Sequence, residues 1–516
     1  MIFALAALIY IHGAFQYPWL EDDDPWSHAV SSKYVALEKN ISPPSGTFHY
    51  LNPYPPGYAI IMGLLHQIHP SLHWVLKFFN GLIISLGFLF FYIMARELSR
   101  DQDKALLSTF FLLLAPCYLS HFIWAHALAV TLFFPAFYFL MKCLTDKKQI
   151  VPAAICCAAI PLVQPTQAIK FAIMALLMLA AYAISYRGRG AWKNVIAAIL
   201  GGILIAALWW GSVAMDMLAG KSEVITRKDT VYAAAAPTGT VAKNIFAASG
   251  GTATEAYTLA DYITFPKYNW INNPKGLGFF FSFLALLGLI YTCIRIFRTS
   301  QPHQRYYFST IIFWLVFTFL GMNSKTFNLP IGLFAFRFWM LFAIPASFLA
   351  AEGIFILLKK LRHPLIAPAI TLMFILIVTF QSGKYKYQFN HSQWTYGVYW
   401  NSDREMDGYL WLREYLPANT KVFMFTDNQL VIGMDMRADV WSQDYRLAFA
   451  HAFHDDLEHL HHNLIRQGFS YILVTRRDAQ RFGPEPVNEK LENMDRHPGF
   501  ERILSNRESF IFRVLP

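Results

Sequence analysis

The acidic run from Glu21 to Asp24, followed by Pro25-Trp26-Ser27-His28, is the stretch of this sequence best suited to chemistry. It comes directly after the first apolar segment, and four acids beside a membrane are costly unless a cation or a basic partner lies nearby. Asp24-Pro25 also has the form of a helix start, with Asp as N-cap and Pro at the first helical position. Capping accounts for one Asp, but not for four acids with His28 one helical turn beyond Asp24. We therefore predict a metal-binding or catalytic role for this cluster.

Carboxylate oxygens are the ligands of hard cations such as Mg²⁺ and Mn²⁺, which in turn hold phosphate oxygens. Asp24 and Asp22 are the predicted metal ligands, and Asp24, with Asp23 beside it, is the predicted general base. A divalent cation beside a membrane suits a lipid-phosphate leaving group, whose developing charge it neutralises. These residues predict group transfer from a lipid-linked phosphate.

Arg337, in Phe336-Arg337-Phe338, lies at the external end of a predicted span, against the usual distribution of basic residues. Snorkelling of the side chain to the interface is one explanation. The other is phosphate binding, because a planar guanidinium at headgroup height suits a lipid phosphate. We predict that Arg337 binds the substrate phosphate.

Two further residues are weaker candidates. His126 lies near the external end of another predicted span. It is either a histidine at the membrane interface or a metal ligand supplied by the second external loop. Glu255 lies in a long external loop, where most acids are simply solvated.

The composition identifies the elements that must position these residues. Of 516 residues, 55% are hydrophobic and only 15% are charged, whereas soluble proteins carry about 25% charged residues. Long apolar runs accompany this deficit, so the chain is predicted to be a polytopic membrane protein. The net charge of +10 reflects short basic loops on one side of a membrane and not a nucleic-acid surface. All five cysteines lie in apolar segments, as small core residues do.

We predict about eleven spans, namely 1–17, 73–95, 105–119, 121–143, 150–164, 168–186, 194–213, 277–297, 306–322, 337–358 and 364–381. Every short basic loop then falls on one side, which is the cytoplasmic side. Loops 18–72 and 214–276, the short loop 323–336 and everything after 382 are external.

The chain is predicted to divide into a transmembrane domain, 1–382, and an external domain, 383–516. In the second part helical and strand patterns alternate, which predicts a small α/β domain. Its expected elements are helices over 405–416 and 443–467, a strand over 471–475 and a hairpin over 500–514.

Several of these motifs resemble one family. Asp24-Pro25-Trp26-Ser27-His28 resembles the Asp-Pro-aromatic-x-His/Asn motif in the first external loop of oligosaccharyltransferase catalytic subunits, which belong to the GT-C class of glycosyltransferases. Tyr54-Pro55-Pro56-Gly57-Tyr58 resembles the Tyr-Pro turn that ends that loop. Phe336-Arg337-Phe338, followed by Pro345, resembles the Arg-Phe span, and Thr252-Ala253-Thr254-Glu255 is similar to the Thr-x-x-Glu of the mobile loop. The resemblance implies that Arg337 contacts the donor phosphate and that Glu255 reaches the metal and the acceptor.

The sequence also departs from that family. Val30 stands where the first motif usually has Arg, and the second loop lacks the usual acidic pair, with His126 in roughly that region. The family carries Trp-Trp-Asp-Tyr-Gly, which reads the acceptor, where this chain has Phe425-Thr426-Asp427-Asn428-Gln429. The donor half of the resemblance therefore carries over better than the acceptor half.

The sequence predicts a GT-C like glycosyltransferase of the hexosyl- or oligosaccharyl-transferase class in the plasma (inner) membrane. It would move a sugar or glycan from a polyprenyl-phosphate or polyprenyl-diphosphate donor to a protein, lipid or glycan acceptor on the external, periplasmic face. A transporter or flippase of lipid-linked cargo is one alternative. It would carry paired charges within its spans, whereas this sequence has few charges there, with Lys170 as an exception. A non-catalytic assembly protein that binds partners through the C-terminal domain is the other.

Overall fold

The computed structural model describes residues 1–21, 23–41, 51, 54–188, 190–218, 255–265, 271, 274–329, 333–359, 366–391, 401–426, 429–434, 436–437 and 450–516. The chain forms two compact units. The helical unit comprises residues 1–16, 80–221 and 225–392, and the mixed unit comprises 17–79, 222–224 and 393–516.

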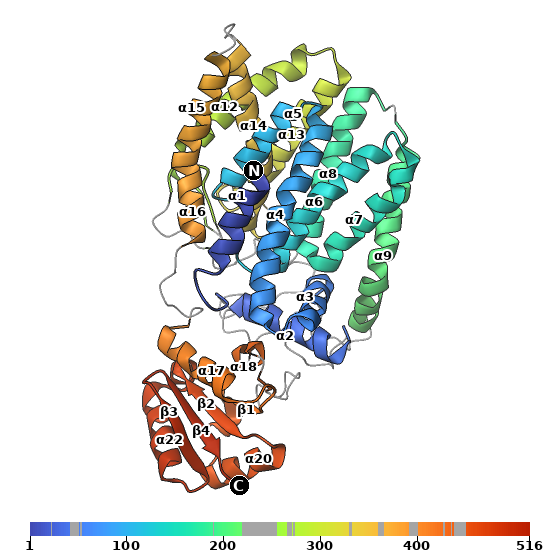
Figure 1. Ribbon diagram of the computed structural model, residues 1–516. Coiled ribbons are helices and arrows are strands. Elements are labelled where there is room, and N and C mark those ends of the chain that lie inside the picture. Colours follow the sequence, from blue (N-terminus) through green and yellow to red (C-terminus); the bar gives the residue numbers. More distant parts are fainter. Residues whose placement is uncertain are drawn as a thin grey trace. The chain divides into compact units, whose positions relative to one another are not determined.

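The helical unit is a bundle of long apolar helices (Figure 1). Its elements are α1 (Ile2–Ala7), η1 (Leu8–His12), α4 (Leu72–Ser99) from Asn80 onward, α5 (Gln102–Leu114), α6 (Ala125–Cys143), η2 (Lys147–Gln149), α7 (Ile150–Val163), α8 (Pro165–Tyr186), α9 (Trp192–Leu218), α11 (Leu259–Ile263), α12 (Phe279–Arg298), α13 (Pro302–Met322), η4 (Ala335–Phe338), α14 (Trp339–Lys359), α15 (Ile366–Val378), η5 (Thr379–Gly383) and α16 (Lys384–Asn390).

Within the described part of the chain, eight helices are long and apolar enough to cross a membrane. They correspond to eight predicted spans, and the predicted polytopic membrane fold is confirmed. The other three predicted spans are helical but shorter. The first ends at His12, α5 ends at Leu114 just before Pro116, and α7 ends at Val163 because Pro165 starts the next helix.

The predicted sidedness of the loops agrees with contacts at the two ends of the bundle. At the predicted cytoplasmic end, Lys142 Nζ lies 2.7 Å from Glu97 Oε2, and Asn194 Nδ2 donates to the carbonyl of Cys143 at 3.1 Å. At the opposite end, the backbone N–H of Cys117 donates to the carbonyl of Gly276 at 3.1 Å. Loops assigned to the same side are therefore in contact with each other.

Glycines allow α12 and α14 to pack closely. A Cβ on Gly288 of α12 would lie 1.8 Å from the carbonyl oxygen of Leu349, and one on Gly353 of α14 would lie 2.2 Å from that of Leu284. Small residues at such crossings let membrane helices approach each other.

The mixed unit combines helices with a four-stranded sheet of order β1-β2-β4-β3. β1 pairs parallel with β2, and β4 pairs antiparallel with both β2 and β3. Its elements are α2 (Asp23–Glu38), α3 (Gly57–Ile68), the start of α4, α17 (Asp403–Tyr415), β1 (Val422–Phe423), α18 (Gln429–Gly433), α20 (Leu457–Gln467), β2 (Tyr471–Thr475), α21 (Arg476–Phe482), α22 (Pro484–Arg496), β3 (Phe500–Ser505) and β4 (Ser509–Val514).

The small α/β sheet predicted for the C-terminal region is confirmed, with the strand over 471–475 and the hairpin over 500–514 in place. The predicted helix over 443–467 is shorter in the described residues, since α20 begins at Leu457. Asp456 caps it by accepting hydrogen bonds from the backbone N–H groups of Glu458 and His459. Residues 443–449 lie outside the described residues.

Candidate functional site

The predicted acidic motif begins α2 in the mixed unit. The helix starts at Asp23, and Asp24 lies half-buried in its first turn, followed by the buried Pro25. Asp22 and the side chain of Asp23 lie outside the described residues. The helix therefore begins two residues before Pro25, the predicted first helical residue, and Asp23 and Asp24 lie at its N-terminus, where the dipole favours negative charge.

His28 is buried against the Tyr-Pro turn. Its ring centre lies 4.8 Å from that of Tyr58 and 6.2 Å from that of Tyr54. Burial lowers the pKa of His28 to about 4, against the opposing effect of the Asp24 carboxylate. His28 is therefore neutral at physiological pH, and the structure brings together the two segments that carried the family resemblance in the first loop.

Glu21 has the basic partner that the acidic run required. Glu21 is 5% exposed, and it interacts electrostatically with Lys77, which is 1% exposed. The Lys77 ammonium also donates to the carbonyl of Tyr17. One of the four acids is thus accounted for by an internal charge pair.

The motif helix α2 packs on α18, the short helix that follows β1. The Trp26 ring lies against Gly433, where a Cβ would come within 2.4 Å of it. Lys33 donates from Nζ to the carbonyls of Ile432 at 3.0 Å and Met436 at 3.3 Å. The acidic motif is therefore attached to the C-terminal sheet within one compact unit.

Arg337 belongs to the helical unit and lies in the 3₁₀ turn η4 that precedes α14. Its guanidinium carbon is 5.1 Å from the centre of the Trp124 ring and 5.3 Å from each of the Phe334 and Phe336 rings. Cation–π contacts of this kind hold a guanidinium in place.

His126 and Lys170 lie around the same group. His126 is 1% exposed, and its ring centre is 4.8 Å from that of Trp124. Lys170 Nζ lies 4.3 Å from the centre of the Phe338 ring, next to Arg337 in sequence. The helices α6 and α8 and the turn η4 thus bring a histidine and two cations to one region of the unit.

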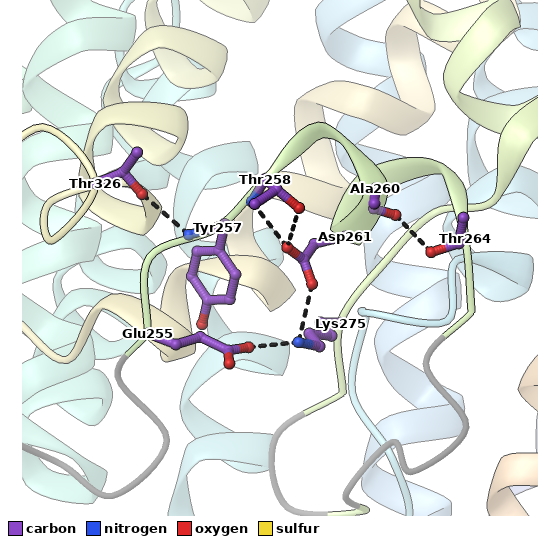
Figure 2. A network of polar contacts seen from close by, with 8 residues as sticks. All are labelled: Glu255, Tyr257, Thr258, Ala260, Asp261, Thr264, Lys275 and Thr326. Carbon is purple, nitrogen blue, oxygen red and sulfur yellow. Dashed lines mark hydrogen bonds and ion pairs between the residues drawn. The ribbon is translucent and has the colours of Figure 1, made fainter.

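Glu255 is held by Lys275 (Figure 2). The Lys275 ammonium pairs with the Glu255 carboxylate and with Asp261 Oδ1, the latter at 3.0 Å. The two carboxylates raise the pKa of Lys275 despite the opposing effect of its partial burial. Thr252 to Thr254, the rest of that predicted motif, lie outside the described residues.

The segment that carries Glu255 packs on the helix that follows Arg337. The rings of Tyr257 and Tyr262 lie 5.3 and 4.9 Å from that of Trp339, centre to centre. The backbone N–H of Tyr257 donates to Thr326 Oγ1 at 3.0 Å (Figure 2). Two predicted site residues, Glu255 and Arg337, therefore belong to adjoining segments.

The donor chemistry of the first loop fits a hard divalent cation, because its acids supply carboxylate oxygens. Among the described residues, no group of three or more His, Cys, Asp or Glu side chains is placed to hold a metal ion. Asp22, one of the three predicted ligands, lies outside those residues. A site made of Asp24, Asp22 and His126 stays a prediction.

Solved structures with the same architecture come from two kinds of membrane glycosyltransferase. The oligosaccharyltransferase of Archaeoglobus fulgidus, tethered to an acceptor peptide, matches with a TM-score of 0.55 and 13% identity over 99% of this chain and 73% of that one. ArnT from Cupriavidus metallidurans, bound to undecaprenyl phosphate, matches with a TM-score of 0.55 and 10% identity over 99% of this chain and 97% of that one. The chain has the GT-C fold.

This match confirms the predicted GT-C fold class and the structural resemblance to oligosaccharyltransferases. A second complex of the archaeal enzyme AglB, with an inhibitory peptide and a dolichol-phosphate, has a TM-score of 0.52 and 13% identity, covering 92% of this chain and 69% of that one. No family model matches the sequence, and no curated protein matches it. The GT-C fold is thus shown by structures that share only 10–13% sequence identity with this chain.

Sequence reasoning missed several residues that the GT-C bundle assembles. From the sequence, Lys170 is recognised only as a charge within a span, and no role is predicted for Trp124 or Lys275. An available signal was the presence of a lysine near the external end of an apolar helix, on the same predicted side as Arg337.

Proposed function

We propose that this GT-C protein is a membrane glycosyltransferase that moves a sugar or glycan from a polyprenyl-phosphate or polyprenyl-diphosphate donor to an acceptor on the external face. The observation that carries the proposal is Arg337, whose guanidinium contacts three aromatic rings. A half-buried guanidinium held by such contacts is well suited to a phosphate. Solved GT-C proteins with this architecture have been captured with dolichol-phosphate or undecaprenyl phosphate.

The proposed reaction is attack of an acceptor hydroxyl or amide on the anomeric carbon of the donor sugar. Asp24, with Asp23 beside it, orients the acceptor or removes its proton, which typically contributes 10²–10⁴-fold to the rate. The bond between the anomeric carbon and the phosphate oxygen breaks, and its electron pair stays on the phosphate. Arg337 stabilises the negative charge that develops there.

Glu255 and a divalent cation complete the proposal. Asp24, Asp22 and His126 would hold the cation, which would supply further charge neutralisation for the leaving phosphate. Glu255 would contact the acceptor after its ion pair with Lys275 breaks. The acceptor itself is proposed only as a protein, lipid or glycan group.

Mass spectrometry of lipid-linked sugars and glycans tests the transfer, in cells with the gene, without it, and with Asp24→Ala. A transferase predicts that the donor accumulates, and one glycan disappears, both in the deletion and in the Asp24→Ala strain. Asp146→Ala, at the predicted cytoplasmic end, is the matched control and should behave as wild type.

Two results would contradict the proposal. If Asp24→Ala leaves the lipid-linked sugars and glycans unchanged while deletion of the C-terminal domain alters them, the protein is a non-catalytic assembly protein. If lipid-linked cargo changes side without cleavage of its glycosidic bond, it is a transporter.

A further inference from the structure

Lys170 is a buried cation in the helical unit. It lies in the second turn of α8 and is 0% exposed, and its ammonium has no hydrogen-bond partner among the described residues. Its contact with the face of Phe338, at 4.3 Å, offsets only part of the cost of removing a charge from water. A buried ammonium whose charge is not neutralised requires an anion beside it.

The protein supplies a second cation at this point. Arg337 lies close enough to Lys170 for like-charge repulsion. Four acids among the described residues of the helical unit pair with other lysines: Glu352 with Lys104, Glu97 with Lys142, and Glu255 and Asp261 with Lys275. A buried lysine beside a half-buried arginine is tolerated when an anion binds between them.

Gln167 adds a neutral hydrogen-bonding group to the same face of α8. It lies three residues before Lys170, so the two side chains share one face of the helix. Gln167 is 0% exposed, and its amide nitrogen makes a long contact of 3.9 Å with the sulfur of Met340, a residue of α14. Thioether sulfur is a weak acceptor, so this amide is available to a stronger one.

We infer that Lys170 is a second phosphate-binding residue, which together with Arg337 and Gln167 forms a site for the phosphate of a polyprenyl-linked substrate. This inference rests on the proposed function, and it specifies that the site binds the leaving phosphate more tightly than the intact donor. Cleavage of the glycosidic bond adds one negative charge to the phosphate that remains on the lipid. A second cation therefore stabilises the leaving phosphate more than the intact donor, and such differential stabilisation accelerates the reaction.

Undecaprenyl phosphate is the probe that tests this site, with the full-length protein in detergent micelles and native mass spectrometry as the measurement. Lys170→Met should weaken its binding by about ten- to a hundredfold, the usual effect of losing a hydrogen bond to a charged group. Lys170→Arg should retain most of the affinity. Undecaprenol, which has no phosphate, should bind wild type and Lys170→Met equally, and competition by inorganic phosphate would show that the headgroup alone is recognised.

A thermal unfolding measurement separates ligand binding from a structural role. Removing an unneutralised buried charge should raise the unfolding temperature of the ligand-free protein in Lys170→Met. Lys386→Met is the matched control, because Lys386 is also 0% exposed but donates to the backbone carbonyls of Tyr118 and Leu119. It should lower the unfolding temperature and leave phosphate affinity unchanged.

The inference is overturned if Lys170→Met binds undecaprenyl phosphate as tightly as wild type, or if undecaprenol binding falls equally. In either case the transferase proposal survives as long as Asp24→Ala still abolishes transfer. If instead transfer is absent from cells but Lys170→Met selectively loses undecaprenyl phosphate, the phosphate site stands and the transferase proposal fails.

Discussion

Arg337 and Trp124 form a cation–π pair, with the guanidinium carbon 5.1 Å from the centre of the indole ring. Trp124 is 4% exposed and immediately precedes α6, whereas Arg337 lies in η4, the turn that leads into α14. Two turns far apart in the sequence thereby fix one cation. The proposed donor site depends on this pair as much as on the arginine itself.

Trp124→Ala should weaken undecaprenyl phosphate binding by about 2- to 30-fold, which corresponds to the usual worth of a cation–π contact. Trp124→Phe retains an aromatic face and should lose less. Trp192→Ala, at the predicted cytoplasmic end, is the control. Unchanged lipid affinity in Trp124→Ala, measured by native mass spectrometry, would show that Arg337 needs no support from this ring.

Lys275→Met should loosen the segment from Glu255 to Phe265. The change leaves the Glu255 and Asp261 carboxylates without the ammonium that joins them in Figure 2, and the two like charges then repel. Hydrogen exchange of the backbone amides in this segment should become faster, while Lys275→Arg should keep the protection. Equal exchange rates in all three proteins would rule out a holding role for Lys275.

Gly321→Ala should damage the phosphate site from a distance. A Cβ at position 321 would lie 2.3 Å from Cε1 of Phe338, the ring that Lys170 faces. Overpacking of this kind costs about 1–3 kcal/mol and displaces side chains. We expect a lower unfolding temperature and weaker lipid-phosphate binding.

Gly211→Ala is the matched control for that substitution, since no atom lies within 4 Å of a Cβ added there. It should leave both the unfolding temperature and the lipid affinity as they are in wild type. A Gly321→Ala protein indistinguishable from Gly211→Ala would mean that the Phe338 ring can move without consequence.

The C-terminal domain should lose stability as the pH rises from about 4.5 to above 7. Burial raises the pKa of Glu405 to about 7, more than Arg477 lowers it, and burial raises that of Asp478 to about 6, against the hydrogen bond from the backbone of Thr475. A carboxyl whose pKa is higher in the folded than in the unfolded state stabilises the fold when it is protonated. This contribution is complete at a pH below the unfolded-state pKa, and it is lost as the pH rises through the folded-state pKa. For Glu405 the loss is on the order of 3 kcal/mol.

Hydrogen exchange of the β2 amides between pH 4.5 and 8, corrected for intrinsic rates, measures this effect. Glu405→Gln removes the larger of the two titrations and should flatten the pH dependence. Glu501→Gln, an exposed position on β3, should leave the wild-type slope intact. A Glu405→Gln profile that matches wild type would show that Glu405 is not the group responsible.

The polytopic class, the segregation of loops to two ends and the small C-terminal sheet could be predicted from the sequence, because each rests on local pattern. Apolar runs of about twenty residues predict spans, and the alternation of helical and strand patterns predicted β2 and the β3–β4 hairpin. The lengths of three predicted spans were wrong in detail, since Pro116, Pro165 and local caps end helices where hydropathy alone continues.

Local pattern also singled out Asp24 and Arg337, because an Asp-Pro helix start in an acidic run and an arginine at the external end of a span are unusual wherever they occur. It did not assign partners, which depend on contacts between residues far apart in the chain. Only the tertiary structure put Lys77 beside Glu21, Lys275 beside Glu255, and Lys170 beside Arg337. The physical reason is that a charge is recognised in sequence by its type, but its cost and its use are decided by burial and by its neighbours.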